Sequence, residues 1–326
     1  MTNHLCQPVA IALVLSASTL GLATAANAET ANSDSQESEF DTDQEAPVVQ
    51  DHSGWRLEPG LRVTARAVST GSRIRIEDES VNGNALVFVA IPTLSVVKDD
   101  TSVTFSNSVS RYEFDERGRA GRWLNAARLT GRYDLTEDTS ISAFGERSDN
   151  LFLAEAPSAD EWEVGGEVEH HFDDTSRVQL GASWRERSYD DVAKSDGSGP
   201  RIDGEYRYRF GANHYAFLRG RYESIDSDTP FRELDRWRAE ASYQRPIARD
   251  LRLRSELTYQ RLSFPGRPLA GGGVREDDLF WPELTLTYSP GAWRISTEAR
   301  YVVRNSSDPD FDRSGYRLEL EVSHAF

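Results

Sequence analysis

The sequence predicts an all-β protein, an antiparallel up-and-down barrel of about 14 strands that crosses a membrane with those strands. Residues 316–326, at the C-terminus, alternate between apolar and polar or charged side chains, as a strand does when lipid covers one face and water the other. Such alternation recurs from Trp55 onward at a spacing of one strand plus one connection. The mean hydropathy is −0.60, and no mature segment reaches the roughly 20 apolar residues of a membrane helix.

Residues 1–28 have the pattern of a signal peptide. A short apolar run over residues 8–25 is followed by Ala26-Asn27-Ala28, a small-x-small cleavage site. We therefore expect the chain to be exported. Cys6, the only cysteine, precedes the apolar run, so the mature chain has none. This excludes disulfides, thiolate nucleophiles and cysteine metal sites.

Residues 29–54 are expected to form a disordered, acidic periplasmic leader. They contain eight acidic residues and no Lys or Arg, and too few apolar side chains to build a core. The segment accounts for almost half of the formal net charge of −17. It is either a solvated leader or a tail that docks a basic periplasmic partner or folds into the barrel against arginines.

Residues 55–326 are expected to form the barrel. The runs of alternation begin near Trp55, Ala85, Thr101, Trp123, Thr139, Glu161, Arg177, Arg201, His214, Arg236, Asp250, Phe280, Ala292 and Gly315. The runs near Ala85, Thr101 and Thr139 alternate weakly, so a count between about 12 and 16 strands is compatible with the pattern.

The connections between these runs alternate between short and long. The short ones carry turn-forming residues, as in Lys98-Asp99-Asp100 and Ser289-Pro290-Gly291. The longer, more polar ones are expected at residues 69–84, 149–160, 189–200, 224–235, 263–278 and 305–314, with a brief one at 115–121. Short turns on the periplasmic rim and long loops on the outer rim are typical of membrane barrels. Aromatic side chains bracket the strands and predict two interfacial girdles, with Tyr215 among the residues near the short turns.

The inward positions of the strands are charged almost throughout, which predicts a wet lumen, because a dry core could not accommodate so many charges. Only two of the 37 basic residues are lysines, and arginine binds carboxylates and phosphates through a planar fork. A mixed Arg/Glu lining implies weak charge selectivity, and the same residues could form cross-strand ladders that stiffen the wall. The expected pore-lining residues are Arg62, Arg128, Glu167, Arg185, Glu205, Arg207, Arg209, Arg219, Arg221, Glu240, Arg254, Glu256, Glu283, Arg294, Glu298, Arg300, Arg317 and Glu319.

No pattern in the sequence predicts catalysis. Apart from His52 in the leader, the mature histidines lie at strand ends beside turns or the C-terminus, away from where a base would act on an outer-side substrate. There is no phosphate loop and no metal-ligand spacing, so we expect no catalytic residue, metal or cofactor. The acidic balance also argues against nucleic acid as a partner.

The C-terminal strand resembles that of outer-membrane β-barrels of Gram-negative bacteria, in which a terminal aromatic after apolar alternate residues is the assembly signal. Phe326 fills that position, and His324 departs from the usual aliphatic or aromatic residue. The chain length suggests the monomeric, 14-stranded porin type. The resemblance implies location in the outer membrane, contact with its lipid and lipopolysaccharide, and assembly by the barrel-assembly machinery.

Together, the lumen and the resemblance favour a channel for passive diffusion of small hydrophilic solutes. One alternative is an accessory barrel for export of a polysaccharide or surface protein, whose leader docks a periplasmic component. Another is a closed structural barrel with a salt-bridged lumen. Inward Phe217 and Trp281 could stack on sugars along the wall or could plug it.

Overall fold

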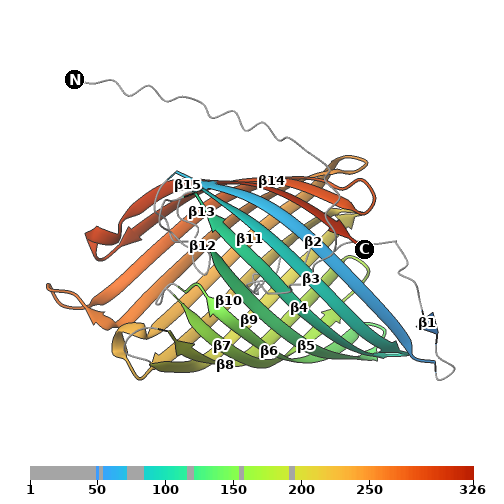
Figure 1. The fold of residues 1–326 in the computed structure, drawn as a ribbon, viewed down its shortest axis with the longest axis horizontal. Coiled ribbons are helices and arrows are strands. Elements are labelled where there is room, and N and C mark those ends of the chain that lie inside the picture. The colour runs from blue at the N-terminus through green and yellow to red at the C-terminus, as the bar shows by residue number, and fades with distance from the viewer. Residues whose placement is uncertain (1–48, 51–53, 72–83, 116–120, 154–157, 191–194) are drawn as a thin grey trace.

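The computed structural model describes residues 49–50, 54–71, 84–115, 121–153, 158–190 and 195–326 (Figure 1). The expected signal peptide and most of the expected leader lie outside these residues. The fourteen expected strands are confirmed. They are β2 (Arg56–Thr70), β3 (Asn84–Lys98), β4 (Thr101–Phe114), β5 (Arg122–Thr136), β6 (Thr139–Leu151), β7 (Ala159–His171), β8 (Ser176–Tyr189), β9 (Asp196–Gly211), β10 (His214–Ser227), β11 (Leu234–Ala248), β12 (Leu251–Pro268), β13 (Val274–Tyr288), β14 (Trp293–Ser306) and β15 (Arg313–Ala325).

Each strand pairs antiparallel with its neighbours in sequence, and β15 pairs with β2 to close the barrel. The closing register runs from Arg317 opposite Thr70 to Ala325 opposite Arg62. Closure leaves no unpaired sheet edge, which a membrane barrel requires because lipid cannot hydrogen-bond to the backbone. Within the expected leader, β1 (Val49–Gln50) pairs with Leu57 and Arg56 of β2.

The six short connections lie on one rim, together with the C-terminus (Figure 1). Two of them are tight turns in which a short polar residue takes the left-handed conformation, Asp99 with φ +47° and Asn213 with φ +54°. Asp and Asn tolerate this backbone better than most side chains.

The strands extend further into the opposite rim than the sequence predicts. Strand β9 begins at Asp196 rather than near Arg201, and β13 begins at Val274 rather than near Phe280. The glycine-rich stretches there suggest loops, yet the backbone stays paired, with Pro268 of β12 opposite Val274. Several expected outer loops are therefore short turns on long hairpins, as the β12–β13 and β14–β15 hairpins show in Figure 1.

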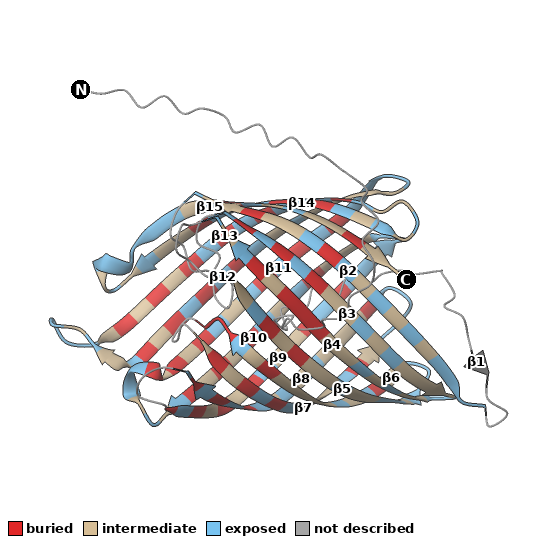
Figure 2. Cartoon of the chain, in the orientation of Figure 1, coloured by how far each residue is buried: buried red, intermediate tan, exposed pale blue. Residues whose placement is uncertain are grey.

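Outward and inward faces alternate along each strand (Figure 2). The outward positions carry large apolar side chains that remain exposed, such as Leu180 and Leu218, each 59% exposed. A continuous exposed apolar surface of this kind is a lipid-facing belt. Among the described residues, no helix has the length and apolar character to span a membrane.

Aromatic residues lie on this outward face near the strand ends, including Trp162, Trp184 and Trp237. The prediction for Tyr215 is wrong. Tyr215 lies on the same inward row of β10 as Phe217 and Arg219. The Arg207 guanidinium lies 5.2 Å from its ring.

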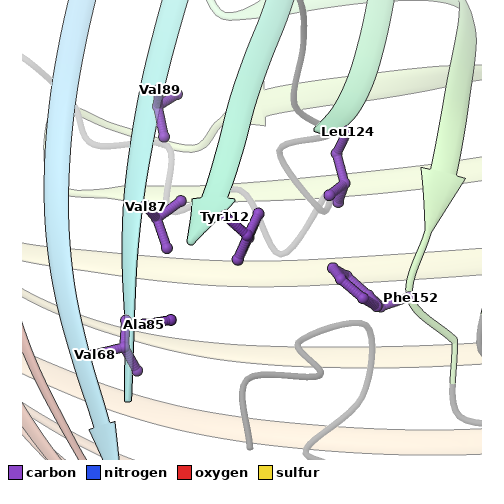
Figure 3. Packing of buried hydrophobic residues seen from close by; sticks show 7 residues of the cluster. All are labelled: Val68, Ala85, Val87, Val89, Tyr112, Leu124 and Phe152. Atoms are coloured by element: carbon purple, nitrogen blue, oxygen red, sulfur yellow. The ribbon is translucent and has the colours of Figure 1, made fainter. Parts of the chain in front are cut away.

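The inner wall is not charged throughout, as the sequence suggested. Seven buried side chains from β2 to β5 and from just beyond β6 form an apolar cluster there, shown in Figure 3: Val68, Ala85, Val87, Val89, Tyr112, Leu124 and Phe152. In β3 both faces are apolar, since Leu86 and Phe88 face the lipid while Val87 and Val89 face inward. This explains why the run near Ala85 alternates weakly.

Candidate functional site in the barrel lumen

The candidate site is the inner wall of the barrel. All the expected lining residues lie on the strand face opposite the exposed apolar belt. They belong to β2 (Arg62), β5 (Arg128), β7 (Glu167), β8 (Arg185), β9 (Glu205, Arg207, Arg209), β10 (Arg219, Arg221), β11 (Glu240), β12 (Arg254, Glu256), β13 (Glu283), β14 (Arg294, Glu298, Arg300) and β15 (Arg317, Glu319). That they line a conducting pore remains a proposal.

One ladder of ion pairs crosses β7 to β10. Its centre is Glu205, whose carboxylate is 2.6 Å from Arg219, 3.0 Å from Arg207 and 3.6 Å from Arg177. Arg219 lies directly opposite Glu205 in the register, and facing residues on neighbouring strands are close enough to pair. Arg177, which continues the ladder to Glu169 at 2.8 Å, was not among the expected lining residues.

A separate group of buried ion pairs is centred on Glu223 of β10. Its carboxylate lies 3.0 Å from Arg185 and 3.0 Å from Arg236. Glu223 is 1% exposed and the two arginines are 2% exposed. The alternation of β10 indicates that Glu223 points inward, but it carries no signal for the second arginine, which comes from the next strand. The geometry gives one buried carboxylate two guanidinium partners.

A second ladder runs over β12 to β15 and reaches β2. The Glu283 carboxylate is 2.8 Å from Arg300 and 3.4 Å from Arg254. The ladder continues on β15, where Arg317 and Glu319 are 2.5 Å apart. It then crosses the seam of the barrel, because Arg66 of β2 donates a 2.9 Å hydrogen bond to Glu321 of β15.

Arg62 and Arg294 lie at the end of the second ladder nearest the short turns. Both interact electrostatically with Glu321, and Arg294 is also within range of Arg62, Arg252 and Arg254. This end of the wall therefore concentrates positive charge. Arg128, on β5, lies 3.1 Å from Glu146 and packs 3.8 Å from the centre of the Phe144 ring.

Apolar side chains collect at the outer end of the lumen. Besides the cluster in Figure 3, Leu151, Leu153, Ala159 and Tyr189 form a second group. A third group consists of Leu234, Leu262, Phe264, Leu279, Trp281 and Val302. All three lie toward the rim opposite the short turns. Together these groups form an apolar collar, which is interleaved with buried ion pairs such as Arg275 and Asp277, 2.8 Å apart. Sequence alternation identifies the inward positions but not this collar.

The buried polar atoms without a hydrogen-bond partner include four beside the third apolar group: Oγ1 of Thr258, Oε1 and Nε2 of Gln260, and Nε1 of Trp281. These three residues are 0–1% exposed. A buried polar group without a partner costs roughly 1–3 kcal/mol. Within the described ranges, no group of His, Cys, Asp and Glu residues has the arrangement of a metal site.

The comparisons show what this barrel is similar to. The sequence matches no family model and no curated protein. Among solved structures, OmpT, an outer membrane protein of Vibrio cholerae, aligns with a TM-score of 0.53 at 9% identity, covering 86% of this chain and 100% of that one. The outer membrane channel DcaP of Acinetobacter baumannii aligns with a TM-score of 0.50 at 11% identity, covering 85% and 99%. The likeness shows the fold, a closed antiparallel β-barrel like those of these outer membrane proteins, and the exposed apolar belt is that of a barrel that spans a membrane.

Proposed function

We propose that the protein is a channel for passive diffusion of small hydrophilic solutes across the outer membrane. The observation that carries the proposal is the pair of Arg–Glu ladders on the inner wall, around Glu205 and around Glu283. Side chains of this kind are stable beside water and costly in a dry core, and rings of charged groups along a pore filter solutes. The expected lining residues are the filter in this proposal.

The pairing of carboxylates with guanidinium groups within each ladder determines the charge selectivity that we expect. Glu205, Glu223 and Glu283 each have a guanidinium within 3.0 Å, so the electric fields of the positive and negative groups largely cancel. The channel should therefore discriminate weakly between small anions and cations, with a modest anion preference from the group around Arg294.

A closed structural barrel is the second candidate, and the depth of burial favours it. Glu223, Arg236 and Trp281 are each no more than 2% exposed, so the inner wall around these residues is tightly packed. A barrel of this kind would stabilise the envelope without conducting.

The remaining parts of the proposal concern export and assembly. We propose that residues 1–28 are removed on export, that residues 29–54 then contact a periplasmic partner, and that the barrel acts as a monomer. Phe326 is the proposed assembly signal. Its backbone N–H donates to the Leu61 carbonyl at 2.9 Å, and the Leu61 N–H donates back at 3.4 Å, so this residue helps to close the seam.

Single-channel recording in a planar bilayer tests the function. We expect stable open steps from the refolded mature chain, and a reversal potential in a salt gradient that shifts toward the anion potential in Glu205→Gln, because three arginines then lose their shared carboxylate. Glu276→Gln, on the outward face, is the matched control and should leave the reversal potential unchanged. Silence of the mature chain, both with and without residues 29–54, would support the closed barrel instead.

A further inference from the structure

A patch of uncharged hydrogen-bonding groups lies on the inner wall beside the apolar collar. We infer that Thr258, Gln260 and Trp281, with Arg238 and Glu240 beside them, form a subsite for a neutral polyhydroxylated solute, that is, a saccharide. The inference rests on the proposed channel function and assigns it a substrate class.

The register places these five residues together. Gln260 of β12 lies opposite Arg238 of β11, and on the next inward row Thr258 lies opposite both Glu240 of β11 and Trp281 of β13. Facing inward residues of neighbouring strands have Cβ atoms about 5 Å apart. The patch is therefore one site on the wall, not a set of scattered residues.

The unpartnered atoms define the hydrogen-bonding capacity of the patch. Thr258 offers a hydroxyl, Gln260 offers both a carbonyl oxygen and an amide nitrogen, and Trp281 offers an indole N–H, and none of these four atoms has a partner. Together they can donate and accept without adding charge. The groups are 0–1% exposed, so side chains packed against them, such as Arg238 over the Trp281 ring, move aside when a solute binds. The solute then supplies the hydrogen bonds that these groups lack.

Trp281 supplies the apolar half of the site. Its indole belongs to the cluster with Leu279 and Val302, and the Arg238 guanidinium lies 5.3 Å from the ring centroid. A sugar ring combines an apolar C–H face with hydroxyls around its edge, so it can contact the indole and the amide at once.

Other classes of solute fit the patch less well. Arg238 and Glu240 are 3.3 Å apart and neutralise each other, so an ionic solute would add an unpaired charge to a buried place. A purely apolar solute would leave the hydroxyl, amide and indole N–H groups without partners. The neutral saccharide satisfies both requirements.

Maltotriose is the probe for the test, applied to the folded mature chain in a planar bilayer. We expect it to interrupt the open-channel current reversibly, and we expect Gln260→Leu and Thr258→Val each to shorten the interruptions at least tenfold. Gln179→Leu, an inward glutamine of β8 far from the patch in the register, is the matched control and should behave like the parent chain. Heat-modifiable migration in detergent gels verifies that each variant is folded.

The outcomes separate the subsite from the channel. Open steps that do not respond to maltotriose, or that respond equally in all variants, overturn the subsite and leave the channel proposal standing. Absence of open steps overturns the channel proposal, and maltotriose titration of tryptophan emission then decides the subsite.

Trp281 is the one buried residue among the seven tryptophans, all of which the structure describes. A saturable change that is missing in Trp281→Phe and Gln260→Leu supports the subsite, and no change in the parent chain overturns it.

Discussion

At the scale of single residues, the strongest stability prediction concerns Glu223. Replacement by Gln would leave Arg185 and Arg236 with their charges in a place that is almost fully covered. Removing one partner of a buried ion pair typically costs about 3–5 kcal/mol. We expect Glu223→Gln to lower the free energy of unfolding in detergent by an amount on the order of 3 kcal/mol, measured by urea denaturation.

The outward pair of Arg261 and Glu276 provides the comparison. Their side chains are 2.6 Å apart but 45% and 42% exposed, and exposed ion pairs contribute about 0–1 kcal/mol. Glu276→Gln should therefore leave the unfolding midpoint nearly unchanged. Equal destabilisation by the two variants would mean that the Glu223 network is as well solvated as the outer surface.

The same residues show what the sequence can predict at this scale. The period of two identifies Glu223 and Trp281 as inward residues, because one face of each strand must be apolar toward lipid. It cannot give their burial, which depends on side chains that approach from other strands. Tyr215 shows that a position near a turn does not by itself place an aromatic residue in the girdle, because its alternation with Phe217 directs it inward.

At the scale of elements, the turn between β7 and β8 has a predicted pH dependence. The Asp173 carboxylate accepts hydrogen bonds from the hydroxyl of Thr175 at 2.7 Å, from its backbone N–H at 2.7 Å, and from both groups of Ser176. The Thr175 hydroxyl and the other donors lower the pKa of Asp173 from 3.8 to about 2. The charged form is thus favoured in the folded turn.

The sign of the effect follows from this depressed pKa. The ionised carboxylate stabilises the fold above pH 3.8, and its contribution is lost as the pH falls toward 2. We expect Asp173→Asn to be less stable than the parent chain at neutral pH, with the difference disappearing near pH 2 when unfolding is followed by circular dichroism. A difference that stays constant over this range would exclude the ionised carboxylate as its source. Asp250→Asn, in another short turn, is a suitable control.

Most strands could be predicted from the sequence, and their outer ends could not. Turn-forming residues locate the short connections well, because a tight hairpin needs residues such as Asp99 and Asn213 at left-handed positions. At the outer rim, Gly197 and Gly199 suggest a loop, yet β9 already includes them. Backbone pairing between long neighbouring strands outweighs the local preference of glycine there.

At the scale of the whole molecule, the barrel has three zones that the sequence presents as one alternating pattern. Outside is the apolar belt, inside is the charged wall, and toward the rim opposite the short turns the charged groups share that wall with the apolar collar. The sequence predicts a uniform charged lining, because charged inward residues are easy to recognise where they alternate with apolar outward ones. An inward apolar residue such as Val87 gives no such contrast.

The tryptophans test which side chains of the barrel face lipid and which face inward. Five of them, Trp123, Trp162, Trp184, Trp237 and Trp293, lie outward and are 46–59% exposed, whereas Trp281 is inward and 1% exposed. Acyl chains that carry bromine quench tryptophans in contact with lipid. We expect brominated phosphatidylcholine to quench most of the emission, more strongly with bromines near the headgroups than near the chain ends, because the outward indoles lie toward the ends of their strands.

The emission that resists quenching should be lost in Trp281→Phe, whereas Trp237→Phe should remove only quenchable emission. Uniform quenching of all tryptophans would place Trp281 against lipid, and absence of quenching would place the exposed belt outside the bilayer.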